Sequence, residues 1–84
     1  MSEETRRVLD LLAQGKITVD EGTPLLQKLE AAAAARARAD CATASKLYQA
    51  FINELQAQSG KKVDAAAAAA IMIADAQYLI AHCP

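Results

Sequence analysis

Two alanine-rich stretches constrain the fold of this 84-residue chain more than any other feature of its sequence. Five consecutive alanines follow Glu30, and six follow Asp64. Alanine has the highest intrinsic helix propensity because its side chain loses no rotational entropy in a helix. The chain also has only three glycines and two prolines, too few for the many turns of an all-β domain. The sequence therefore predicts an all-α protein of three to four helices.

The first helix is expected to begin near Ser2 and to end at Gly15. Serine is a favourable N-cap residue, and Glu3 and Glu4 follow it in the first turn, where the helix dipole favours anions. An apolar stripe at helical spacing begins at Val8. Glycine ends helices well because it adopts a left-handed backbone conformation at no steric cost.

Two starting points remain open for the second helix. Thr18 and Glu21 have the spacing of a capping box, which predicts a start at about Thr18. Pro24 would then lie inside the helix, where it removes one backbone hydrogen bond. The alternative is a cap at Thr23, which places Pro24 at the favoured first helical position.

No glycine or proline lies between Leu25 and Gln58, so one long helix can continue through this whole range. Its segment from Glu30 to Ala39 resembles the semi-rigid helical spacers that are built from alanine with sparse charges. We therefore predict two helical hairpins joined through a long Ala-rich helix. The expected boundaries are an N-terminal hairpin at 1–30, a helical spacer at 31–40 and a C-terminal hairpin at 41–84. A rigid spacer would keep the first hairpin away from the last helix.

The C-terminal hairpin is expected to fold back around Gly60, with the last helix at about 65–82. In such a hairpin, facing residues have numbers that sum to about 122–124. This arithmetic pairs large side chains with small ones, which suits close packing. The predicted pairs are Phe51 with Ile71, Tyr48 with Ala74, Leu55 with Ala67, and Ala44 with Tyr78.

The same arithmetic places Cys41 near Cys83, at the open end of the hairpin. Two reduced thiols are the simplest interpretation of these cysteines, although a disulfide between them is geometrically possible. With His82 they could also offer ligands to zinc or form an activated thiol, but a fourth zinc ligand has no obvious source. We predict no metal, no cofactor and no enzymatic activity.

Charge and hydropathy limit the choice of partners and location. The formal net charge is −1, and no basic run is longer than two residues, which disfavours nucleic acid as the main partner. The longest apolar run, 65–74, is too short to cross a bilayer as a helix. An acidic N-terminus without a following apolar segment predicts a cytoplasmic protein.

The last helix is apolar on nearly all sides, so it must be buried on more than one face. A single neighbouring helix cannot cover it. The first two helices could fold back and complete its burial within one chain, but a rigid spacer works against this and favours cover by other chains. We therefore predict a homo-oligomer, or a complex with a protein partner, formed through the apolar faces of the last two helices as an oligomeric helical bundle. The predicted interface residues are Leu47, Tyr48, Phe51, Leu55, Ile71, Met72, Ile73, Tyr78, Leu79 and Ile80.

The N-terminal third resembles a known family. Residues 4–21, which read ETRRVLDLLAQGKITVDE, are followed by Leu25-Leu26 and Leu29, and together they resemble the SHOCT-like family of short bacterial helical hairpins. The segment Gly22-Thr23-Pro24 departs from the expected pattern of that family's second helix. The resemblance implies oligomerisation or protein tethering in a bacterial protein.

Two other interpretations accompany this one. The Ala-rich junction would suit an engineered fusion of two helical pieces. A function from another class is a small DNA-binding regulator, in which the first two helices form a helix-turn-helix. Residues 1–30 carry more acidic than basic side chains, which counts against this alternative. Its phosphate contacts would be Arg6, Arg7, Lys16 and Lys28.

Overall fold

The computed structural model describes residues 3–66 and 70–83, and four α-helices account for most of them. In chain order they are α1 (Glu3–Ala13), α2 (Val19–Ala37), α3 (Cys41–Gln58) and α4 (Ala70–Ala81). The predicted all-α class is confirmed.

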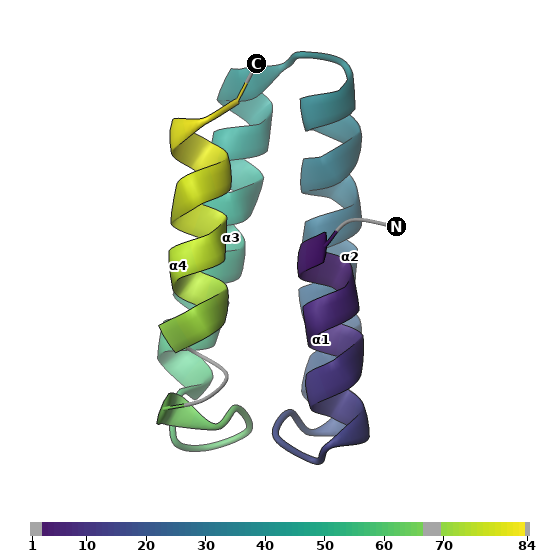
Figure 1. Ribbon diagram of the computed structural model, residues 1–84, viewed down its shortest axis with the longest axis vertical. Coiled ribbons are helices and arrows are strands. Elements are labelled where there is room, and N and C mark those ends of the chain that lie inside the picture. The colour runs from purple at the N-terminus through teal and green to yellow at the C-terminus, as the bar shows by residue number, and fades with distance from the viewer. Residues whose placement is uncertain (1–2, 67–69, 84) are drawn as a thin grey trace.

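The four helices lie side by side and alternate in direction, as Figure 1 shows. Helix α2 packs along α3, α3 along α4, and α1 along both α2 and α4, so the helices form a closed ring of contacts. The bundle measures 33 × 19 × 16 Å. Helix α4 therefore has neighbours from both halves of the chain.

One apolar core runs through this bundle and draws on every helix. Its largest fully buried side chain is Phe51 of α3. Alanines take part as well, because small side chains allow two helix backbones to approach closely. The buried apolar residues are Val8, Ile17, Leu25, Leu29, Ala32, Ala35, Ala44, Tyr48, Phe51, Ile52, Leu55, Val63, Met72 and Ala76.

Helix α1 ends as predicted, at a left-handed glycine. Gly15 has a φ of 74°, and its N–H donates to the Leu12 carbonyl at 3.1 Å. The Lys16 N–H donates to the Leu11 carbonyl at 2.9 Å. These two bonds form a Schellman motif, which satisfies carbonyls that the end of a helix would otherwise leave unbonded.

Helix α2 begins directly after Thr18, so the earlier of the two predicted starts is confirmed and the start at Thr23 is wrong. The capping box itself does not form, because the Thr18 side chain makes no cap hydrogen bond. Glu21 is buried against Glu54 of α3 instead of reaching back to the cap. Pro24 lies within the helix and costs only the bond to the carbonyl of the exposed Asp20, which water can satisfy.

The sequence allowed one continuous helix from Leu25 to Gln58, but the structure has two helices in this range. Helix α2 ends at Ala37, and Ala39 has a φ of 58°. The Asp40 N–H donates to the Ala35 carbonyl at 3.0 Å, which gives α2 a Schellman end as well. The Asp40 carboxylate then accepts a hydrogen bond from the Thr43 N–H at 3.2 Å and caps α3.

This turn overturns the argument from a rigid spacer. Helix α3 folds back along α2, and Ala32 and Ala35 of the alanine run are buried in the core. Helix α1 is thereby brought against α4. The boundaries predicted at 1–30, 31–40 and 41–84 stay a prediction, although all three segments contribute to one core.

At the opposite end of the bundle, the α1–α2 turn pairs with the loop that follows α3. The Thr18 N–H donates to the Lys62 carbonyl at 3.0 Å, and the Asp64 N–H donates to the Lys16 carbonyl at 2.8 Å. Between these bonds, Ile17 and Val63 are buried and close the end of the core. The loop reverses direction at Gly60, whose φ is 78°.

Helix α4 presents a different face to α3 than the predicted pairing requires. Met72 and Ala76 point into the core, whereas Ile71, Ala74 and Tyr78 are exposed. The predicted pairs that involve these three exposed residues are therefore wrong. The arithmetic assumed that α3 was the only neighbour of α4, but α4 also packs against α1. The fourth predicted pair includes Ala67, which lies outside the described residues.

Candidate functional site

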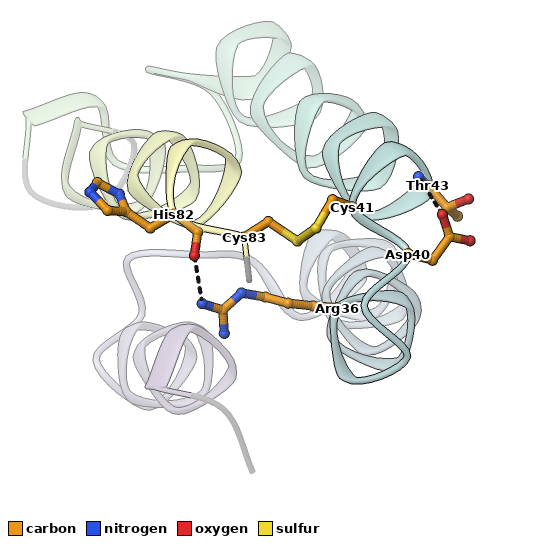
Figure 2. Close-up of a disulfide and its surroundings, with 6 residues drawn as sticks. All are labelled: Arg36, Asp40, Cys41, Thr43, His82 and Cys83. Atoms are coloured by element: carbon orange, nitrogen blue, oxygen red, sulfur yellow. Dashed lines mark hydrogen bonds between the residues drawn. A yellow bond between two sulfur atoms is a disulfide. The ribbon is translucent and has the colours of Figure 1, made fainter.

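A disulfide joins the two cysteines at the end of the bundle where α3 begins and α4 ends (Figure 2). The Cα atoms of Cys41 and Cys83 are 5.8 Å apart, a normal separation for a disulfide. The hairpin arithmetic brought these residues together correctly. The simpler interpretation, two reduced thiols, is wrong for this structure.

His82 lies next to this disulfide in sequence, but its ring points away from it, as Figure 2 shows. Its Nδ1 lies 2.9 Å from the Tyr78 carbonyl oxygen, and its ring stacks on the Tyr78 ring with centroids 4.0 Å apart. Arg36 of α2 donates from Nη2 to the His82 carbonyl at 3.3 Å. Both cysteine sulfurs are consumed by the disulfide, so the zinc and activated-thiol arrangements do not form.

The ten predicted interface residues fall into three groups. Tyr48, Phe51, Leu55 and Met72 are buried within the chain and contact other helices of the same bundle. Leu47, Ile73, Leu79 and Ile80 are partly buried against that core. Ile71 and Tyr78 remain open to solvent, so the surface available to a partner is narrower than predicted.

The outer face of α4 carries these two exposed side chains. Tyr78 is 61% exposed and Ile71 is 45% exposed. They lie seven residues apart, two helical turns, and the exposed Ala74 lies between them on the same face. We call Ile71, Ala74 and Tyr78 the α4 outer face. Leu9 of α1 and Val19 of α2 are the other exposed large apolar side chains among the described residues.

The α4 outer face borders a polar seam between α1 and α4. Arg7 Nε lies 2.7 Å from Asp75 Oδ2 across this seam. One hollow of about 230 Å³ opens on the Tyr78 side of the ion pair, and another of about 160 Å³ opens on the Ile71 side. The helices therefore meet less closely here than in the core.

Glu4 of α1 is the residue in this region that the sequence did not single out. Its carboxylate was expected only to interact favourably with the dipole at the start of the helix. In the structure Glu4 is only 3% exposed and lies beside Asp75, with which it lines one hollow. Burial raises the pKa of Glu4 to about 8, and the nearby Asp75 carboxylate adds to this effect. Its position four residues before Val8, on the buried face of α1, was the available signal.

A larger cavity lies on the other side of Glu4, between α1, α2, α3 and α4. Its volume is about 560 Å³, and Arg36, Tyr48 and Leu79 contribute to its walls. Burial raises the pKa of Tyr48, whose hydroxyl therefore stays protonated at neutral pH. The cavity places hydrogen-bonding groups beside an apolar wall.

The cations of the predicted DNA-binding alternative are dispersed or already engaged. Arg7 pairs with Asp75, and Lys28 Nζ lies 3.6 Å from Glu54 Oε1. Helices α1 and α2 run alongside one another, whereas the two helices of a helix-turn-helix cross at a steep angle (Figure 1). Arg6 is exposed on α1, and Lys16 lies in the turn that follows α1. The arrangement gives this alternative no support.

Within residues 3–66 and 70–83, no helix has both the length and the apolar character that a membrane crossing requires.

Comparison with known proteins identifies the N-terminal third of the chain. Residues 3–32 match the family model of a SHOCT-like domain, which confirms the resemblance inferred from the sequence. The match covers α1, the turn at Gly15 and the first part of α2. Neither the search of curated proteins nor the search of solved structures found a match.

Proposed function

We propose that this chain is a non-enzymatic protein-interaction module that self-associates through the α4 outer face. The single observation that carries the proposal is the exposure of Ile71 and Tyr78 on one side of α4. The other large apolar side chains of that helix are at least partly buried. Exposing apolar area to water costs free energy, which a protein partner covering this face would recover.

The geometry of the α4 outer face suits a second copy of the same helix. Ile71 and Tyr78 flank Ala74, so two antiparallel α4 helices that cross near Ala74 would place Ile71 of one copy beside Tyr78 of the other. A small side chain at the crossing point allows close approach of the backbones. Such an arrangement is symmetric about a twofold axis, as in most homodimers.

The N-terminal match supports a role in association. A SHOCT-like domain is a small helical module, and here its two helices form one side of the bundle while α4 forms part of the other. We propose a bacterial source on the same ground. Binding of a different protein to the same face is the alternative, which experiment must distinguish from self-association.

The disulfide bears on the cellular location of the protein. The cytoplasmic location expected from the sequence stays a prediction. The Cys41–Cys83 bond counts against it, because cytoplasmic reducing systems keep most thiols reduced. Intact mass before and after alkylation, without reductant, would show whether the protein as isolated contains this bond.

A dilution series followed by NMR tests the proposed face. We expect amide signals of Ile71, Ala74 and Tyr78 to shift between about 1 mM and about 10 μM protein, since weak dimers dissociate over this range. The signal of Val19, an exposed apolar residue on α2, serves as the internal control and should not move. Shifts centred on Val19 or on Leu9, or no shifts at all, would contradict the proposal.

A further inference from the structure

Two carboxyl groups meet at the seam between α1 and α4. Glu4 is buried there, and it lines the same hollow as Asp75. Glu4 Oε1 and Asp75 Oδ2 are both buried oxygens without a hydrogen-bond donor. Arg7 Nε is close to Asp75 Oδ2, at 2.7 Å, but its N–H is not aligned for a hydrogen bond to that oxygen. Two ionised carboxylates in this position would repel each other and leave both oxygens unsatisfied.

One proton shared by the two carboxyl groups removes their repulsion and satisfies both buried oxygens. A carboxylic acid at Glu4 donates a hydrogen bond to the Asp75 carboxylate, and Asp75 keeps its charge for Arg7. We infer that Glu4 and Asp75 share a proton that clamps α1 to α4, and that loss of this proton loosens α1 from the bundle. This inference concerns attachment of α1 and does not depend on the proposed α4 interface.

The charged and titratable groups around Glu4 come from all four helices. Arg7 on α1 favours the ionised form of Glu4, whereas burial and Asp75 on α4 favour the protonated form more strongly. Glu3 of α1, Arg36 of α2 and Tyr48 of α3 line the cavity on one side of Glu4, and Tyr78 of α4 lines the hollow on the other. The raised pKa of Glu4, about 8, is the net result of these opposing influences.

Release of the clamp has a defined structural consequence. Val8 lies one helical turn after Glu4 on the same side of α1 and is fully buried. Met72 and Ala76 of α4 are also fully buried in the core. Loosening α1 at high pH therefore gives water access to core residues of both helices, while the α2–α3 pair keeps its own contacts.

NMR titration of the wild-type protein tests the clamp directly. The side-chain carboxyl ¹³C signal of Glu4 should change with a midpoint near pH 8. Amide hydrogen-exchange protection of α1, taken relative to α3, should fall by about tenfold or more between pH 6 and pH 9. A Glu4 midpoint near its ordinary value of 4.5 would overturn the inference.

The variant Glu4→Gln separates the proton from the packing. Its side-chain amide can donate to Asp75 at any pH, so α1 protection should be the same at pH 6 and pH 9. Glu30→Gln, at an exposed position of α2, is the matched control and should retain the wild-type loss of protection. An equal loss of protection in Glu4→Gln and wild type would contradict the clamp. If Glu4→Gln does not fold, the wild-type carboxyl titration decides the question alone.

Discussion

The α2–α3 interface and the α1–α4 seam use different physical means to hold two helices together. Leu29 and Ala32 of α2 and Phe51 of α3 are buried apolar residues, and this pair of helices carries most of the core. Across the α1–α4 seam, by contrast, Arg7 pairs with Asp75 beside open hollows. Apolar burial is insensitive to pH, whereas an interface held by carboxyl groups is not. The α2–α3 pair thus depends mainly on apolar burial, with one carboxyl contact between Glu21 and Glu54, whereas carboxyl groups have a larger part in the α1–α4 seam.

Truncation of the largest fully buried side chain should have the greatest effect. We expect Phe51→Ala to lower the free energy of unfolding by about 3–5 kcal/mol, because it removes a fully buried ring and leaves a cavity. The matched aromatic control is Tyr78→Ala on the exposed side of α4, with an expected change within about 0.5 kcal/mol. Urea denaturation measures both. Similar losses in the two variants would mean that α4 buries Tyr78 in solution.

Removal of the disulfide should follow in magnitude. The bond between Cys41 and Cys83 closes a loop across 42 positions of sequence. Restricting the unfolded chain in this way stabilises the fold by about 2–4 kcal/mol. We expect the double variant Cys41→Ala/Cys83→Ala to lose about this much in urea denaturation, and reductant to have no effect on it. An equal loss on adding reductant to the double variant would show that the effect is unrelated to the bond.

The free energy of unfolding should depend on pH through carboxyl groups at the α1–α4 seam and at the α2–α3 interface. The raised pKa of Glu4 means that its proton stabilises the fold fully below about pH 4.5, and that this stabilisation disappears as pH rises through about 8. We expect wild type to lose roughly 1–3 kcal/mol between pH 5 and pH 8.5, after allowance for solvent screening.

A second carboxyl contact contributes in the same direction. Burial and Glu54 of α3 raise the pKa of Glu21 on α2. Glu4→Gln should therefore reduce the slope of stability against pH, and Glu4→Gln/Glu21→Gln should reduce it further. A slope unchanged by either substitution would show that other groups govern the pH dependence.

The smallest predicted effects concern the ends of α1 and α2, which use the same motif with different residues. Ala39 pays a steric cost for its left-handed conformation, so Ala39→Gly should stabilise the protein by about 1 kcal/mol. Gly15→Ala should destabilise it by about the same amount, since no atom lies within 4 Å of the added Cβ and only the backbone conformation is penalised. Thermal unfolding of both variants measures the difference. A shift of the same sign in both would contradict the assignment.

These two turns also show why the sequence predicted one helix end and missed the other. Gly15 is a strong local signal, and α1 ends there. The turn at Ala39 has no glycine or proline, and only Asp40 with its N-capping side chain marked the start of α3. Because alanine favours a helix at this position, the packing of α3 on α2 must compensate for the reversal.

The candidate site was predictable only in part for a related reason. The arithmetic of the C-terminal hairpin placed Cys41 beside Cys83, because a local turn at Gly60 determines that register. It could not determine which face of α4 is exposed, since nearly every side of α4 is apolar and α1 is a distant neighbour in sequence. The burial of Glu4 arises from that same contact between α1 and α4.

Sedimentation equilibrium is the most direct test of whether α4 has one apolar face for its own chain and another for a second copy. Wild type measured over a hundredfold range of concentration should show a mass that rises from monomer toward dimer. The variant Ile71→Ser/Tyr78→Ser should remain a monomer, while Val19→Ser, which removes an exposed apolar side chain from α2, should behave as wild type. A monomeric wild-type protein across the whole range, or a dimer that survives Ile71→Ser/Tyr78→Ser, would contradict the proposed function.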